Sequence, residues 1–162
     1  MKMKPARLFR RLVFSTAMML LGSAAALEAQ TISITDLGTL GGNTSHALAI
    51  NNLGQAVGSS TTPTGMPRAF FWSPGEGLRD LGTLGGDLSE ALSINSRGQV
   101  AGGSATGDGE WHAFLWSPAE GMVDLGTLGG NSSHALFINE LGQVAGTSTD
   151  RAGVERLFFW TP

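Results

Sequence analysis

The sequence predicts an all-β fold built from three repeats of 44 residues, each with four strands. The segment DLGTLGG begins at Asp36, Asp80 and Asp124, and a shift of 44 residues aligns the chain with itself without a gap. The first copy (36–79) matches the second (80–123) at 25 of 44 positions. A period of this length is typical of repeat architectures. No helical period is sustained after residue 30, so the repeats are predicted to consist of strands.

Residues 1–29 are predicted to be a cleaved secretory signal peptide. A head of five basic residues precedes an apolar stretch over 12–22 that is too short to span a bilayer well. Small residues supply cleavage sites after position 26 or position 29. Residues 30–162 then form a single exported domain, in the periplasm or outside the cell. The chain has no cysteine, which excludes lipidation at cysteine and disulfides, and no second apolar stretch of membrane length follows.

The exported part is acidic. Residues 30–162 contain five arginines and no lysine against twelve carboxylates, and five minus twelve gives a net charge of −7. A negative charge without a basic patch is unfavourable for binding nucleic acid or an anionic membrane. The sequence therefore predicts neither partner, and no motif in it indicates a cofactor.

Each repeat contains four short strand-like runs separated by turn residues. In the first copy these runs are SHALAIN (45–51), QAVGSST (55–61), PRAFFWS (67–73) and GLRDLGT (77–83). Alternation is clearest in the first run, where Ala47, Ala49 and Asn51 take one face and Leu48 and Ile50 take the other.

The link between the first two runs has the chemistry of a hairpin turn. An Asn at the first turn position can bond the backbone two residues on, and a glycine three positions later adopts positive φ without steric cost. The residues predicted to initiate and close these hairpins are Asn51 and Gly54, Asn95 and Gly98, and Asn139 and Gly142.

The third run carries most of the aromatic side chains. Residues two apart share a strand face, so each repeat presents a Phe and a Trp on one side and another apolar residue on the other. A strand that is apolar on both faces is usually interior. The aromatic pairs are Phe70 and Trp72, Phe114 and Trp116, and Phe158 and Trp160.

The order of strand types suggests how the repeats close. The segment 31–40 resembles a fourth strand without its first three, and the last repeat (124–162) ends after its third strand. The N-terminal strand is therefore predicted to complete the last repeat. Propellers typically need four to eight blades. Three propeller-like repeats would then form an open arc or half of a two-chain ring, and the alternative is a closed threefold barrel of the trefoil type.

These segments resemble a known family. SHALAINNLGQAVG, HAFLWSPAEGMVDLGTLGG and SHALFINELGQVAG are similar to the HAF repeat of bacterial extracellular proteins, named after a His-Ala-Phe triplet that is His112–Ala113–Phe114 here. The resemblance covers essentially all of residues 30–162 and implies an exported protein with propeller-like units. It implies no catalytic residue. Arg68 and Arg156 replace the histidine in the other two copies, which argues against a metal or catalytic role for His112.

Two sets of repeated polar residues are candidate chemical sites. His46, Glu90 and His134 share one repeat position and could ligate zinc if they converged near an axis, but the sequence favours a solvated or backbone-capping role and predicts no metal. The aspartates that open each copy could serve glycoside hydrolysis, which uses two carboxylates. Identical environments do not separate the pKa values of an acid and a base, so a turn-capping role is preferred for them.

The clearest departure from the repeat is Trp111, which aligns with Pro67 and Glu155. An indole beside carboxylates is typical of sugar sites, and also of an ordinary half-exposed edge tryptophan. The polar neighbours of Trp111 in the segment DGEWHAF are Asp108, Glu110 and His112.

The sequence therefore predicts a secreted, non-enzymatic β-repeat protein that binds an extracellular carbohydrate or protein, or has a structural role, through loops on a repeated scaffold. The Trp111 cluster is the candidate binding site. One alternative is a carbohydrate-active enzyme that uses two of the acids. Another is a fragment of a longer repeat protein that needs self-association, for example as a homodimer.

Overall fold

The computed structural model describes residues 32–162, and the predicted signal peptide (1–29) lies outside the described residues. All regular structure in the described range is β-strand. The strands are β1 (Ser45–Ile50), β2 (Ala56–Thr61), β3 (Pro67–Ser73), β4 (Gly77–Asp80), β5 (Gly85–Ile94), β6 (Val100–Thr106), β7 (Trp111–Ser117), β8 (Gly121–Asp124), β9 (Gly129–Ile138), β10 (Val144–Asp150) and β11 (Glu155–Trp160).

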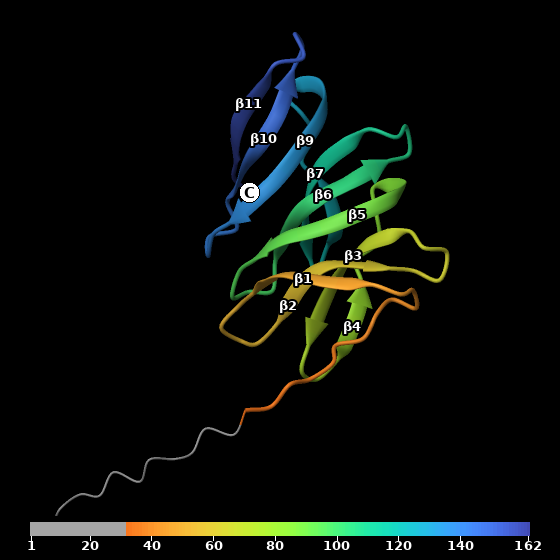
Figure 1. Ribbon diagram of the computed structural model, residues 1–162. Helices are drawn as coiled ribbons and strands as arrows, with labels where there is room; N and C mark the ends of the chain where they lie inside the picture. The colour runs from red at the N-terminus through yellow and green to blue at the C-terminus, as the bar shows by residue number, and fades with distance from the viewer. Residues whose placement is uncertain (1–31) are drawn as a thin grey trace, which may run out of the picture. The chain divides into compact units, whose positions relative to one another are not determined.

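Hydrogen bonding arranges these strands in two sheets (Figure 1). Strands β1 to β4 form an antiparallel sheet in chain order. In the second sheet, β5 to β8 repeat this order and β9 to β11 repeat its first three strands. A parallel pairing of Trp111 in β7 with Ser132 in β9 joins the two groups. The all-β prediction is confirmed.

The described residues form two sheets and no closed barrel, and the choice between a propeller-like and a trefoil-type arrangement stays a prediction. Within the same range, no helix is long and apolar enough to cross a membrane.

The link between the start of each copy and its first strand is held in the same way in all three copies. A leucine amide in the link donates a hydrogen bond of 2.9 Å to a serine hydroxyl of the second strand. The pairs are Leu40 with Ser60, Leu84 with Ser104, and Leu128 with Ser148. Residues 32–40 contain no strand, and β11 pairs with β10 alone in the described range. That the segment 31–40 completes the last repeat therefore stays a prediction.

A bulge in the first strand of each repeat requires a glycine in the second. The pairing of β5 with β6 shifts register between Ala91 and Ser93, and a β-carbon on Gly102 would overlap the carbonyl oxygen of Glu90. The same overlap would occur at Gly58 with His46 and at Gly146 with His134. A bulge bends the strand and increases its twist, so these glycines allow the sheets to curve.

The turns between the first and second strands share one set of contacts. The side-chain oxygen of Asn51 accepts hydrogen bonds from the amides of Leu53 and Gln55 at 3.0 and 3.1 Å. The amide of Gly54 donates to the Asn51 carbonyl at 3.1 Å, and Gly54 has a φ of 73°. Asn95 with Gly98 and Asn139 with Gly142 make the equivalent turns, with φ of 73° and 81° at the glycines.

Each repeat has two apolar faces formed by rows of paired residues. We call the side that meets the following repeat the trailing face and the side that meets the preceding repeat the leading face. The trailing rows are Ala49–Val57–Phe71, Ser93–Ala101–Leu115 and Phe137–Ala145–Phe159. The leading rows are Ile50–Ala56–Trp72, Ile94–Val100–Trp116 and Ile138–Val144–Trp160.

The core consists of contacts between a trailing face and the next leading face. Val57 and Phe71 pack with Val100 and Trp116 in one cluster, where the Phe71 and Trp116 ring centroids are 5.8 Å apart. The guanidinium of Arg79 lies over the same indole at 5.2 Å. Ala101, Leu115 and Val144 form the second cluster, together with the partly buried Ile138 and Trp160. Burial of these side chains is therefore the main force that stacks the repeats.

Candidate functional site

A polar cleft of about 440 Å³ lies where the second and third repeats meet. The pairing of Trp111 in β7 with Ser132 in β9 brings its two walls together. One wall comes from the β6–β7 loop and the start of β7, and the other from β9, β10 and the β10–β11 loop. The lining residues are Gly109, Glu110, Trp111, Asn131, Ser132, Thr149 and Gly153.

The Trp111 ring is positioned in this cleft by contacts with His134 and Gly103. Its ring stacks on His134 of β9, with ring centroids 6.0 Å apart and an angle of 29° between the planes. Gly103 of β6 lies beside the indole, and a β-carbon there would overlap the indole nitrogen. That nitrogen is buried and has no hydrogen-bond partner among residues 32–162. The position of Trp111 is therefore set by packing rather than by a polar anchor.

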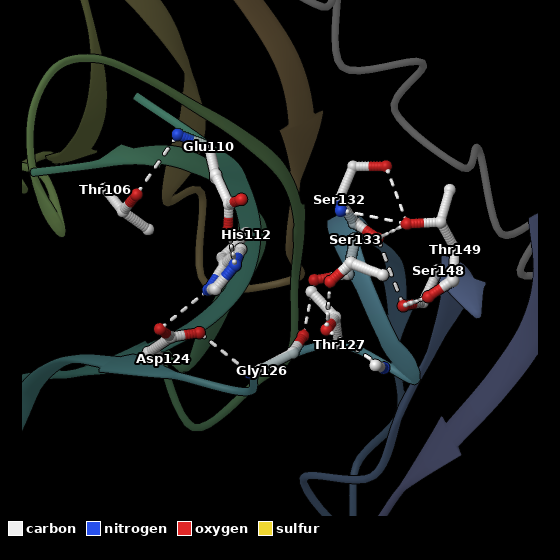
Figure 2. A network of polar contacts seen from close by, with 12 residues as sticks. Thr106, Glu110, His112, Asp124, Gly126, Thr127, Ser132, Ser133, Ser148 and Thr149 are labelled. Atoms are coloured by element: carbon white, nitrogen blue, oxygen red, sulfur yellow. Dashed lines mark hydrogen bonds and ion pairs between the residues drawn. The ribbon is translucent and has the colours of Figure 1, made fainter. Parts of the chain in front are cut away.

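His112 lies between two carboxylates (Figure 2). Its Nδ1 is 2.8 Å from Oδ2 of Asp124, and its Nε2 is 3.6 Å from Oε2 of Glu110. Oδ1 of Asp124 accepts the amide of Gly126 at 2.7 Å, so both oxygens of this carboxylate are engaged. The His112 side chain is 17% exposed. Nε2 is buried and has no hydrogen-bond partner among residues 32–162, so His112 is held through Asp124 rather than through Glu110, which lines the cleft.

The loop that carries Glu110 is a hydrogen-bonded hairpin turn. The amide of Thr106 donates to the Glu110 carbonyl at 2.8 Å, and the amide of Gly109 donates to the Thr106 carbonyl at 3.0 Å. The Glu110 amide also donates to Oγ1 of Thr106 at 3.2 Å. Asp108 is exposed at the tip of this turn and is not one of the residues that line the cleft.

The opposite wall is a network of hydroxyl groups (Figure 2). Oγ1 of Thr149 accepts the amide of Ser132 at 3.0 Å and donates to the Ser132 carbonyl at 3.2 Å. Ser148 donates to the same carbonyl at 3.1 Å. Ser133 accepts the amide of Ala113 at 2.8 Å and thereby ties this wall to β7. The wall is therefore rigid and rich in groups that accept and donate hydrogen bonds.

The three residues His46, Glu90 and His134 do not gather into a metal site. Among residues 32–162 there is no group of three or more His, Asp or Glu side chains with the arrangement that a metal ion needs. The three residues lie on different first strands, β1, β5 and β9, and His134 stacks on Trp111.

The sequence predicts only one wall of the cleft. It does not predict Asn131, Ser132, Thr149 and Gly153, because they are 20 or more residues away from Trp111 and come close only through the parallel pairing of β7 with β9. One signal for the position of the ring does exist in the repeat. Gly103 aligns with Ser59 and Thr147, so the second copy loses a side chain where it gains an indole.

The corresponding residues at the junction of the first and second repeats differ in kind. Glu110, Trp111, Ser132 and Thr149 of the cleft align with Met66, Pro67, Leu88 and Ala105. Glu110 and Trp111 are therefore peculiar to this junction, whereas the hydroxyl wall recurs in the first repeat, where Thr44 and Thr61 make the contacts that Ser132 and Thr149 make here. No family model matches this chain, and neither a curated protein nor a solved structure matches it.

The chemistry of the cleft favours recognition of a polar ligand. It offers one indole, one carboxylate, one side-chain amide and two hydroxyls. Such a mixture is suited to a ligand that has apolar patches and many hydroxyl groups, as a sugar ring does. Glu110 is the one acid among the lining residues, whereas general acid–base hydrolysis of a glycoside needs two.

Proposed function

We propose that this chain is an exported, non-enzymatic binding module that recognises an oligosaccharide in the cleft of Trp111. The observation that carries the proposal is the loss of repeat symmetry at Glu110 and Trp111, where the first copy has Met66 and Pro67 and the third has Val154 and Glu155. A scaffold that is copied without gaps and altered at one surface cleft is what we expect when the scaffold supports folding and the altered residues bind the ligand.

Glu110 and Trp111 have separate roles in this proposal. The indole stacks on the apolar face of a sugar ring, and the carboxylate accepts hydrogen bonds from sugar hydroxyls. His112 lies 3.6 Å from this carboxylate, beyond hydrogen-bond distance, and is held by Asp124. Catalysis is not proposed because Asp124 is engaged by His112 and by the amide of Gly126, which leaves Glu110 as the free acid at the cleft.

We infer that the repeats are arranged as propeller-like blades of the HAF type. Two observations support this inference: the order β1-β2-β3-β4 matches that of a blade, and Val57 and Phe71 pack with Val100 and Trp116 of the next repeat. The cationic head and apolar stretch within residues 1–29 support export.

The proposal is tested by calorimetric titration of the exported chain with a panel of soluble gluco-, xylo- and chito-oligosaccharides. We expect binding to at least one class, a loss of that binding in Trp111→Ala, and partial retention in Trp111→Phe, which keeps a stacking face. Arg97→Gln on the exposed turn between β5 and β6 is the control. Binding that persists unchanged in Trp111→Ala contradicts the assigned site, and release of shorter sugars contradicts the non-enzymatic role.

A further inference from the structure

The trailing face of the third repeat is exposed although its equivalents are buried. Phe159 is 66% exposed, whereas Phe71 and Leu115 at the same repeat position are 5% and 7% exposed. Phe137 beside it is 68% exposed. These side chains border an apolar groove of about 380 Å³, lined by Leu136, Phe137, Ala145, Gly146, Leu157, Phe158 and Phe159. No described residue covers this surface.

The leading face of the first repeat, at the other end of the series, is exposed as well. Ile50 is 72% exposed, and an apolar groove of about 330 Å³ runs along β1. Leu37 lines this groove, as Leu81 packs on the leading face of the second repeat. The segment with Leu37 is therefore in place, and among the described residues there is no trailing face of a preceding repeat to cover the leading face of the first.

The two exposed faces match in size as well as in kind. At the internal junctions a small trailing residue, Ala49 or Ser93, accompanies a valine of the leading row, Val100 or Val144. At the exposed ends the trailing row has the large Phe137, and the leading row has the smaller Ala56. A close-packed junction between these two faces requires that a larger side chain on one face meets a smaller side chain on the other.

Polar groups at the two ends would also pair. At each internal junction a backbone amide of the third strand donates a hydrogen bond to a serine hydroxyl of the next repeat. The Ala69 amide donates to Ser89 at 2.9 Å, and the Ala113 amide donates to Ser133 at 2.8 Å. The equivalents left over are the Leu157 amide and the Ser45 hydroxyl, at opposite ends of the series. Each internal junction also has an Asn amide that donates to the next Asn carbonyl, which leaves Asn139 as a donor and Asn51 as an acceptor.

We propose that the occupant of both exposed faces is a second copy of this chain, bound head to tail. The trailing row Phe137–Ala145–Phe159 of one copy packs on the leading row Ile50–Ala56–Trp72 of the other, and the same contact recurs at the second junction. Two copies then close a ring of six repeats, within the range of four to eight blades that propellers use.

The mass of the exported chain in solution tests the association. Light scattering should give twice the mass of one chain. Phe159→Asp should raise the dissociation constant about a hundredfold, because each ring contains two such junctions and each loses a buried Phe and gains a buried charge. The matched control is Val154→Glu, an exposed apolar residue at the tip of the β10–β11 loop whose repeat equivalent is Glu110. A single-chain mass for the wild type, or a Phe159→Asp variant whose dissociation constant equals that of the wild type, overturns the proposal.

Engineered cysteines test the orientation independently, because the chain has none of its own. Copies with Leu157→Cys are mixed with copies with Ser45→Cys under mild oxidation by oxidised glutathione. Cross-links should form between the two variants and not within either variant alone, since the internal junctions place the equivalent positions in hydrogen-bond contact. Cross-linking of the Leu157→Cys variant to itself would show tail-to-tail association and contradict the head-to-tail contact.

Discussion

The side-chain amide of Asn51 donates a hydrogen bond of 2.9 Å to the carbonyl oxygen of Asn95, which lies 44 residues further along the chain. Asn95 makes the same bond to Asn139 at 3.0 Å. The asparagine that initiates the hairpin turn thus also ties that turn to the next repeat. The repeats are therefore joined by a polar ladder at the turns in addition to the apolar faces between them.

The ladder predicts that Asn95 contributes more to stability than Asn139 does. Asn95 is 2% exposed, and its side chain bonds Gln99, the Arg97 amide and the Asn139 carbonyl. Asn95→Ala leaves these buried groups without partners and should lower the free energy of unfolding by about 3 kcal/mol. Asn139→Ala at the exposed end should cost about 1 kcal/mol, since water replaces its partners.

Asn95→Ala and Asn139→Ala are compared by urea unfolding in chains that also carry Phe159→Asp. This substitution weakens association between copies, so the measured free energy of unfolding reports contacts within one chain. Equal losses at the two positions would show that the turn alone, and not the contact between repeats, accounts for the role of these asparagines.

A second prediction concerns the glycine at the bulge. A β-carbon on Gly102 would overlap the backbone carbonyl of Glu90, which cannot move without breaking the pairing of β5 with β6. Gly102→Ala should therefore destabilise the protein by about 3 kcal/mol, at the upper end of the usual cost of overpacking. Gly107→Ala is the control, because its β-carbon would reach no atom closer than 4.0 Å. Thermal unfolding of both variants is the measurement, and similar melting temperatures would contradict the steric explanation.

The parts of the fold that could be predicted from the sequence are those that depend on nearby residues. The strand class follows from alternation within short runs, and the turns follow from Asn and Gly at fixed spacing, as at Asn51 and Gly54. The ladder from Asn51 to Asn95 could not be predicted, because the acceptor is a backbone carbonyl that any residue carries. Its position depends on how the sheets stack, which local patterns do not specify.

The same distinction applies to the candidate site. Trp111 is visible in the sequence because it departs from the repeat, whereas Thr149 is not, since its hydroxyl is oriented by Ser132 in a neighbouring strand. The zinc hypothesis for His46, Glu90 and His134 assumed that a shared repeat position implies convergence. In the structure these residues lie on the first strands of three successive repeats, so equivalence in the repeat separates them.

Asp150 provides a prediction about pH. The amide of Val154, the guanidinium of Arg156 and the amide of Ala152 bond its carboxylate at 3.0, 3.1 and 2.9 Å, and these contacts hold the pKa of Asp150 below its ordinary value of 3.8. Because the folded-state pKa is lowered, the stabilisation is present above pH 3.8. It is lost as the pH falls from there through the folded-state pKa. The β10–β11 turn, which carries Gly153 to the cleft, should therefore loosen in acid.

Titration of the Asp150 carboxyl carbon by NMR measures this effect. In Arg156→Gln the pKa should rise toward 3.8 and remain below it, because the Val154 amide still bonds the carboxylate. Arg151→Gln removes a neighbouring charge for which the structure shows no bond to Asp150, and it should leave the pKa as in the wild type. A pKa that does not change in Arg156→Gln would mean that the ion pair does not form in solution.

The last prediction concerns the coupling of Gly103 and Trp111. The nearest atoms to a β-carbon on Gly103 all belong to the Trp111 indole, so Gly103→Ala should destabilise the protein by about 2 kcal/mol through the ring alone. In a Trp111→Ala background the same substitution should cost less than about 0.5 kcal/mol, and a double-mutant cycle in urea measures the difference as a coupling energy. Equal costs in the two backgrounds would place the strain in the backbone of β6 and contradict the coupling. Because the added methyl group moves the ring out of the cleft, Gly103→Ala should also weaken oligosaccharide binding without changing any residue that lines the cleft.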